Sequence, residues 1–386
     1  MGAGQLARMA GEAASTLGLS MAVLAESPTD AACDVAAEVI VGSPHVEGAL
    51  RSLAERCDVV TFDHELVDLS LITLLASEGV RIHPGADTLA LAVDKVHMRA
   101  VFVGAGIPVP AHAVLDLAHL DQSGMEDVLT SFGREHGWPL VLKAARGGYD
   151  GKGVWPADDL AQARAVLAPL TGHVLVEEHV EIEAEVAVMV ARRPSGETVS
   201  WPAVETAQVG GVCREVLVPG RLPAAVVEEA AELGRHVADL AGAAGVMAVE
   251  LFLTSEGLMV NEIATRPHNS GHWTIEGAIT SQFENHLRAV LDLPLGATRP
   301  SHPQVASVNV FGGASGADPA GLLPHGLAIE GAHVHLYGKG ARPGRKLGHV
   351  TVCGGDPEDV RARAWKAALA LGSPRPAALS LPDGVA

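Results

Sequence analysis

The most varied group of polar residues in this chain follows an apolar stretch near residue 260. The segment 260–274, VNEIATRPHNSGHWT, contains one carboxylate, one guanidinium, two imidazoles and two amides: Glu262, Arg266, His268, His272, Asn261 and Asn269. Gathering such groups is costly, because each loses hydrating water unless a partner replaces it. The segment therefore predicts a binding or catalytic site at a strand end.

Two glutamates, Glu250 and Glu262, are the first candidates for metal binding. The sequence VMAVELFLTSEGLMVNEIA predicts two strands joined by a three-residue loop, 255–257, with Gly257 in the left-handed position of a G1 bulge. This register places Glu250 opposite Glu262, where like charges repel. Either one acid stays protonated or a divalent cation lies between them; separate pairing of each acid with a Lys or Arg is the third possibility. Oxygen ligands favour Mg²⁺ over zinc, and Mg²⁺ commonly completes its shell with substrate phosphates.

A second candidate site is the glycine-rich sequence LVLKAARGGYDGKGVW at residues 140–155. Glycines lack Cβ, so their backbone N–H groups can close on an anion. A Walker A loop is rejected, because the spacing is one residue short and Gly153 follows Lys152 where Ser or Thr is needed. We predict a glycine flap over phosphates, with a plain hairpin turn as the alternative. Lys143 lies in the apolar strand and needs a partner, either a nucleotide phosphate or a neighbouring acid.

The acidic sequence VEEHVEIEAEV at residues 176–186 follows. Its backbone could bind an adenine along a strand edge, and Glu185 could accept hydrogen bonds from ribose hydroxyls. A solvated acidic face is the alternative interpretation.

These candidate residues require a scaffold of strands and helices. Up to about residue 90, strands at 20–25, 38–42, 57–62 and 80–84 alternate with helices, which indicates a parallel sheet. From 95 to 296 the strands are longer and mixed, and Ser281 with Glu284 predicts a capping box for a helix. A β-rich part and a final helix at 357–371 follow.

Composition limits the class of protein. The 386 residues are 48% hydrophobic with a formal charge of −19, so a polyanion such as nucleic acid is not the expected partner. The four cysteines form no CxxC pair and are expected to be reduced. No stretch approaches the ~20 apolar residues of a membrane span, so we expect no membrane partner and a cytoplasmic protein.

The order of these features resembles the ATP-grasp superfamily: a lysine strand, a glycine flap, a glutamate-rich hinge and a Glu…Asn-Glu hairpin. The segments RGGYDGKG, NEIATRPHNSGHWTIEGAITSQFENHLRAVL and YGKGARPGRKLGHVTV narrow the resemblance to the N5-carboxyaminoimidazole ribonucleotide synthetases. The resemblance implies an α/β and α+β chain with the ATP-grasp fold. It also implies a Rossmann-like parallel-sheet domain at 1–94, an ATP-grasp domain at 95–296 with a flap subdomain at about 110–180, and a small β-rich domain with a tail at 297–386.

The resemblance also implies site residues. Residues expected to bind ATP are Lys95, Lys143, Gly148, Tyr149, Asp150, Gly151, Lys152, Gly153, Val154, Glu177, Glu178, His179, Val180, Glu185, Gln208, Asn261 and Glu262. Glu250 and Glu262 would hold Mg²⁺, with Mn²⁺ as a substitute. Tyr149, Asp150 and Lys152 would face 5-aminoimidazole ribonucleotide, whose phosphate would meet Lys339 and Arg345.

The implied reaction is the ATP-dependent carboxylation of that ribonucleotide with bicarbonate in purine synthesis, in a homodimer. Arg266, His268 and Asn269 resemble the family's bicarbonate pocket. Asp150 is our candidate for orienting or deprotonating the amine, with a structural turn aspartate as the alternative.

The sequence departs from the family in two places. Gln208 stands in VETAQVGGVCRE where the family usually has a histidine, which puts any acid–base role there in doubt. The chain opens with MGAGQL, whereas the family has a strand before its GxGQL turn. Because the loss of a central parallel strand would expose neighbouring edges, we expect the natural chain to begin upstream.

Four different functions compete with the carboxylase. GAGQLA with Glu26 suggests a nicotinamide dehydrogenase, but no strand precedes the glycines and Glu250 and Glu262 would have no use. His268 and His272 suggest a metal hydrolase, yet Pro267 and Gly271 oppose the helix that this spacing needs. The remaining two are a nucleotide-binding module without catalysis and another ATP-grasp purine ligase, such as an ATP-dependent glycinamide ribonucleotide formyltransferase.

Overall fold

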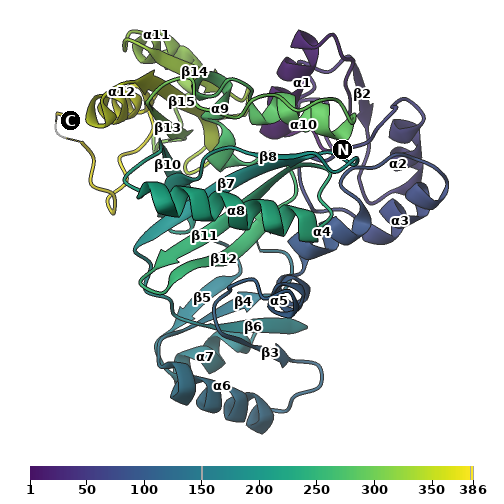
Figure 1. Cartoon of the computed structure of the whole chain (residues 1–386), viewed down its shortest axis with the longest axis vertical. Coiled ribbons are helices and arrows are strands. Elements are labelled where there is room, and N and C mark those ends of the chain that lie inside the picture. The colour runs from purple at the N-terminus through teal and green to yellow at the C-terminus, as the bar shows by residue number, and fades with distance from the viewer. Residues whose placement is uncertain (149–150, 383, 386) are drawn as a thin grey trace.

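The computed structural model describes residues 1–148, 151–382 and 384–385. Figure 1 shows an N-terminal region, a large central sheet that continues into the C-terminal region, and a smaller sheet that projects from the centre. The predicted mixture of parallel and antiparallel sheets is confirmed. None of the described helices is both long and apolar enough to span a bilayer.

The N-terminal region places helices around a small parallel sheet. Its elements are α1 (Gln5–Thr16), β1 (Ala22–Ala25), β2 (Glu38–Val41), α2 (Glu47–Ala54), α3 (Leu69–Ser77) and α4 (Ala86–Val93). Strand β1 pairs with β2 in parallel, as the alternation of strands and helices predicted. The strands predicted at 57–62 and 80–84 are reduced to one parallel bridge between Val60 and Ile82. Pro84 has no N–H with which to extend that ladder.

The first residues of the chain lie between β1 and the segment that follows Val60. The Gly2 amide donates to Leu24 at 3.1 Å, and the Asp63 amide donates to the Met1 carbonyl at 3.0 Å. Helix α1 then begins at Gln5, directly after the glycine turn. The glycine turn and the start of α1 therefore follow a segment that is hydrogen-bonded on both sides, to β1 and to the segment after Val60.

The smaller sheet carries the glycine-rich sequence. Its elements are α5 (Lys95–Gly104), β3 (His112–Asp116), α6 (Gln122–His136), β4 (Leu140–Ala144), β5 (Val154–Ala157), α7 (Leu160–Leu167) and β6 (His173–Glu178). The strand order is β3-β6-β4-β5, and all three pairs are antiparallel. Leu129 of α6 and Ala163 of α7 pack on its apolar side chains. The glycines lie in the connection of the β4–β5 hairpin.

The large sheet runs through the centre and the C-terminal region of the chain. Its strands are β7 (Ala184–Arg192), β8 (Thr198–Ser200), β9 (Val204–Val209), β10 (Val212–Val218), β11 (Gly245–Thr254), β12 (Gly257–Ala264), β13 (Gln304–Phe311), β14 (Ala332–Leu336) and β15 (Lys346–Gly354). Among described residues the order is β12-β11-β7-β9-β10-β13-β15-β14, with β8 beside β7. Because β10 pairs with β13, the C-terminal strands continue the central sheet.

Helices cover this sheet and set its ends. They are α8 (Ala224–Leu240), α9 (Thr274–Gly277), α10 (Gln282–Val290), α11 (Leu323–Leu327) and α12 (Pro357–Ala370). Figure 1 shows α8 across β7 and β11, where Val237 packs against Val188 and Met247. Ser281 caps α10 as predicted, because its hydroxyl accepts from the Glu284 amide at 3.1 Å. These helices bury apolar faces of the sheet. The polar segment that begins at the end of β12 is described below with the candidate site.

Candidate active site

The acidic hairpin has the predicted pairing but a different turn. Strands β11 and β12 bring Glu250 directly opposite Glu262. The three-residue loop is wrong: Thr254 pairs with Gly257, so only Ser255 and Glu256 lie between the strands. The extra residue is Asn261, since Glu250 pairs with Glu262 while Leu251 pairs with Val260. A bulge bends its strand and redirects side chains, so Asn261 and Glu262 can both serve one site.

The two carboxyl groups differ in charge state. Burial, followed by the charges of Glu262 and Glu185, raises the pKa of Glu250 to about 8. Burial also opposes the charge of Glu262, but the ammonium of Lys95 lowers its pKa below the ordinary value. Lys95, the first residue of α5, hydrogen-bonds to the Glu262 carboxylate. The side chain of Glu262 is 41% exposed, so it can be reached by a ligand.

Lys143 has the neighbouring acid that was one of its two predicted partners. Its Nζ lies 2.6 Å from Glu177 Oε2 and donates to Asn261 Oδ1 at 3.0 Å. Glu177 also accepts from Arg99 of α5, at 2.7 Å from Nε. The carboxylate of Glu177 therefore contacts two cations, and its backbone lies in a central strand between β3 and β4. Burial lowers the pKa of Lys143 although Glu177 opposes this effect.

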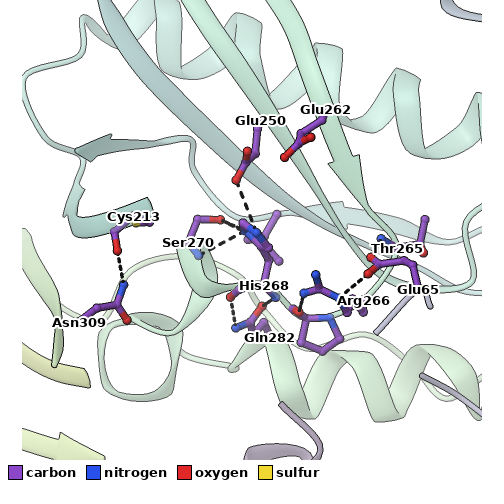
Figure 2. Close-up of polar contacts among 12 residues, drawn as sticks. Glu65, Cys213, Glu250, Glu262, Thr265, Arg266, His268, Ser270, Gln282 and Asn309 are labelled. Carbon is purple, nitrogen blue, oxygen red and sulfur yellow. Dashed lines mark hydrogen bonds and ion pairs between the residues drawn. The ribbon is translucent and has the colours of Figure 1, made fainter. Parts of the chain in front are cut away.

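The expected bicarbonate residues lie directly after β12. Arg266 Nε donates to Glu65 Oε2 at 2.8 Å, and Glu65 Oε1 accepts from the Thr265 amide at 3.1 Å. His268 Nε2 is 3.5 Å from Glu250 Oε1. Figure 2 shows Glu250 and Glu262 close together, with the His268 imidazole directed toward Glu250. The structure thus brings the acidic pair and His268 into one site.

The electrostatics of this segment favour neutral donors and acceptors beside Arg266. Burial lowers the pKa of His268 to about 3, and Arg266 adds to this effect. The Nδ1 atom of His268 lies 2.9 Å from the Ser270 hydroxyl. Asn269 Oδ1 is buried without a hydrogen-bond partner among the described residues. A small polar ligand would satisfy such a group.

The expected adenine hinge lies in the link between β6 and β7. Glu178 Oε1 accepts from the Ala111 amide at 2.7 Å, so this side chain fixes the entry to β3. His179 is exposed and Val180 is half-buried. Burial raises the pKa of Glu185 on β7, although its carboxylate accepts from the Gln208 backbone amide on β9. Glu185 and Gln208 are thus neighbours on the adjacent strands β7 and β9.

The glycine flap approaches the β9–β10 turn. A Cβ on Gly148 would lie 2.7 Å from the Lys152 carbonyl oxygen, so only glycine fits this position. Gly151 has φ +74°, and a Cβ there would lie 2.9 Å from the Gly210 carbonyl oxygen. Lys152 and Gly153 complete the turn before Val154 begins β5. Tyr149 and Asp150 lie outside the described residues.

The expected phosphate-binding residues lie in the loop between β14 and β15. Lys339 Nζ hydrogen-bonds to Gln5, the first residue of α1. Arg345 Nη1 donates to the Gly340 carbonyl at 3.0 Å. Sequence reasoning missed Gln5, although the GxGQL turn was a usable signal, and it also missed Lys346. The charge of Lys346 is among the causes that lower the pKa of His268, which places Lys346 near the residues expected to bind bicarbonate.

The acidic hairpin suits Mg²⁺ better than a metal held by protein alone. Among the described residues, no three His, Cys, Asp or Glu side chains are arranged to hold a metal ion. Glu250 and Glu262 can supply two carboxylate ligands, and burial with the charges of Glu262 and Glu185 raises the pKa of Glu250 to about 8, which a bound cation would oppose. Mg²⁺ commonly uses one or two carboxylates together with substrate phosphates. The residues present therefore fit this ion.

Comparison with known proteins identifies the family. Residues 101–283 match the ATP-grasp domain, 306–363 the phosphoribosylaminoimidazole carboxylase C-terminal domain, and 1–93 the ribonucleotide synthetase preATP-grasp domain. The N5-carboxyaminoimidazole ribonucleotide synthase of Mycobacterium tuberculosis is 44% identical over 95% of this chain and 86% of its own length. The chain belongs to the N5-carboxyaminoimidazole ribonucleotide synthase family. It is therefore an ATP-grasp ligase, as the sequence predicted.

Solved structures of this synthase family have the same fold. The N5-carboxyaminoimidazole ribonucleotide synthetase from Thermus thermophilus has a TM-score of 0.84 at 37% identity, covering 94% of this chain and 96% of its own. The N5-carboxyaminoimidazole synthase of Aspergillus clavatus, in complex with ADP and 5-aminoimidazole ribonucleotide, has a TM-score of 0.85 at 31% identity. That match covers 96% of this chain and 97% of its own. The predicted ATP-grasp fold is confirmed.

Proposed function

We propose that this chain carboxylates 5-aminoimidazole ribonucleotide with bicarbonate, using ATP, to give N5-carboxyaminoimidazole ribonucleotide, ADP and phosphate. One observation carries the proposal: the acidic pair on β11 and β12 lies beside the expected bicarbonate residues that follow β12, with His268 Nε2 3.5 Å from Glu250 Oε1. The phosphoryl donor and the carbonate acceptor can then bind side by side. Membership of the synthase family supports the identity of the nucleotide substrate.

The first step transfers the γ-phosphoryl group of ATP to a bicarbonate oxygen, releasing ADP and forming carboxyphosphate. Lys95 and Lys143 would bind the phosphates, and the flap around Gly148 would cover them. Glu250 and Glu262 would hold Mg²⁺ or Mn²⁺, which neutralises developing negative charge when bound. Lys95 and Lys143 already contact Glu262 and Asn261, so the cations stand where phosphates must arrive.

Bicarbonate would bind to Arg266, His268 and Asn269. Glu65 accepts from Arg266 and so orients its guanidinium beside the strand end. His268 has a pKa of about 3, so near neutral pH it is an uncharged group that hydrogen-bonds the oxyanion. Fixed donors of this kind stabilise charge that develops during reaction.

The second step forms the new C–N bond. The exocyclic amine of the ribonucleotide attacks the carbon of carboxyphosphate, or of the CO₂ that it releases, while phosphate leaves and the nitrogen loses a proton. Lys339, Arg345 and Lys346 would bind the ribonucleotide phosphate, and Gln5 supports Lys339. Asp150, with Tyr149 and Lys152, is proposed to face the amine.

An ADP-release assay with purified chain tests the proposal. We expect ADP and carboxylated product only when ATP, Mg²⁺, bicarbonate and the ribonucleotide are all present, and ADP formation that ignores the ribonucleotide would count against the proposal. Glycinamide ribonucleotide with formate is the control for the related purine ligase and should give no ADP. ADP formation with that pair, or none with bicarbonate and aminoimidazole ribonucleotide, would refute the proposed function.

The assembly and location are part of the same proposal. The family resemblance supports a cytoplasmic homodimer. Sedimentation equilibrium should give twice the chain mass, and a single chain mass across micromolar concentrations would exclude the dimer.

A further inference from the structure

Gln282, the first residue of α10, holds the backbone of His268. Its Oε1 accepts from the His268 amide at 2.9 Å, and its Nε2 donates to the His268 carbonyl at 2.8 Å. Figure 2 shows this side chain beside the His268 backbone. Gly271 leaves room for the amide, since a Cβ there would lie 2.5 Å from Gln282 Oε1. The position of His268 therefore depends on a residue outside its own segment.

His272 fixes the orientation of that amide. Gln282 Nε2 lies 3.2 Å from His272 Nδ1, which accepts the second N–H and leaves the ring proton on Nε2. A flipped amide would lose this contact and both bonds to His268. His272 is buried and packs against His349, with ring centroids 4.8 Å apart.

His349 continues the contacts to the ribonucleotide loop. Its Nδ1 lies 2.8 Å from the Tyr337 hydroxyl, and both side chains are buried. Tyr337 directly precedes the loop at 338–345, and Lys339 Nζ lies 5.8 Å from the centre of its ring. The other face of His349 stacks on His335 at 4.5 Å. A chain of contacts thus runs from the backbone of His268 to the base of the loop.

We propose that Gln282, His272, His349 and Tyr337 form a buried positioning relay, which holds His268 and the Lys339 loop at the separation needed for carboxyl transfer to the amine. This proposal rests on the proposed function. None of the four side chains needs to touch a substrate, so each is a positioning residue. Misplacement of reacting groups by about 1 Å can cost about 10²-fold in rate, so such support is functionally significant.

The surroundings keep the relay uncharged. Burial lowers the pKa of His272 and of His349 well below the ordinary value, and Lys346 and neighbouring imidazoles add to the effect. His335, which stacks on the relay, lies 2.6 Å from Glu276 of α9. Each of the two neutral rings makes one hydrogen bond through Nδ1, and the Nε2 atom of each is buried without a partner among the described residues, so ring packing also holds the arrangement.

Three variants test the relay: Tyr337→Phe, Gln282→Met and the double variant. The readout is the ratio of ADP released to carboxylated product at saturating substrates, because a misplaced carboxyl group is lost to water. We expect each single variant to raise this ratio about threefold or more, while the KM for ATP is unchanged. The double variant should match the more affected single variant, because both act through one relay.

His286→Met is the matched control, because His286 is also buried on α10 but bonds to Thr61 and the Val246 amide. It should lower the melting temperature as Gln282→Met does and leave the ratio unchanged. A wild-type ratio in Tyr337→Phe or Gln282→Met overturns the relay. If Gln282→Met does not fold, the hydroxyl deletion in Tyr337→Phe decides alone. Failure of the wild-type protein to release ADP with bicarbonate and ribonucleotide refutes the proposed function instead.

Discussion

Two charged clusters lie side by side in this site and handle charge differently. In the first, Lys143, Glu177 and Arg99 are all buried, and the single carboxylate is bonded to both cations. In the second, Glu250 and Glu262 face each other with Lys95 on one of them, and the pKa of Glu250 rises to about 8. The first cluster joins two cations to one carboxylate and leaves Arg99 Nη1 without a hydrogen-bond partner among the described residues, whereas the second has an excess of acid. The comparison suggests that the first supports the fold and the second binds a cation.

The largest effect is expected when the second cluster is broken. Glu262→Gln should lower kcat by about 10³-fold, because it removes a metal ligand at the centre of charge development. The free energy of unfolding should fall by only about 1 kcal/mol, because the variant loses the bond between Lys95 and a carboxylate that is partly exposed to water. Steady-state kinetics and urea unfolding measure the two quantities. If Glu262→Gln strongly lowered the free energy of unfolding and kept its kcat, the second cluster would support the fold rather than bind a cation.

Breaking the first cluster should mainly lower the stability of the fold. Glu177→Gln leaves two buried cations without their carboxylate, which should lower the free energy of unfolding by about 3 kcal/mol. Chemical denaturation checks this value, with Glu178→Gln on the same strand as the less buried control. An unchanged unfolding midpoint for Glu177→Gln would show that this cluster is not structural.

A smaller effect is expected in the pH dependence of stability and Mg²⁺ affinity, which distinguishes Glu250 from Glu262. The folded-state pKa of Glu250 is raised above the ordinary value, to about 8, so the metal-free fold binds an extra proton between about pH 5 and 8 and loses stability as pH rises. Mg²⁺ must displace this proton, so its affinity should increase by up to about tenfold per pH unit up to pH 8. Calorimetric titration at three pH values measures the slope. Glu250→Gln should remove it, and a slope that persists in that variant would assign the proton elsewhere.

The smallest effect on the rate is expected at Gln208, near the end of β9 and close to the β9–β10 turn that the flap approaches. Its backbone amide, rather than its side chain, bonds Glu185. Gln208→His should therefore change kcat/KM for ATP by less than about threefold. A large gain in rate would indicate that an imidazole, which the family resemblance leads us to expect at this position, takes part in proton transfer.

Local patterns predicted much of this molecule. The pairing of Glu250 with Glu262 followed from strand spacing and one glycine, and it is confirmed. The turn was wrong because a bulge at Asn261 and a three-residue loop give the same register at that point. Only a ladder of hydrogen bonds distinguishes them.

Contacts between distant segments could not be predicted. Arg99 and Glu177 are far apart in the sequence and meet because α5 packs beside β6. Gln5 and Lys339 meet only when the N-terminal helix approaches the β14–β15 loop. Neither pair has a spacing that sequence periodicity can detect, so Glu177 was expected at the adenine hinge and its bonds to two cations were not predicted.

The unbroken ladder from β12 to β14 has a mechanical consequence. The acidic hairpin and the strands that carry Lys339 belong to one hydrogen-bonded sheet, whereas the glycine flap belongs to the separate β3-β6-β4-β5 sheet. Rotation of the smaller sheet as a rigid body could therefore admit or release nucleotide while the carbonate and ribonucleotide sites keep their spacing. Such a rotation would break the contact between Lys143 on β4 and Asn261 on β12, so opening would separate the phosphate-binding lysine from the acidic hairpin.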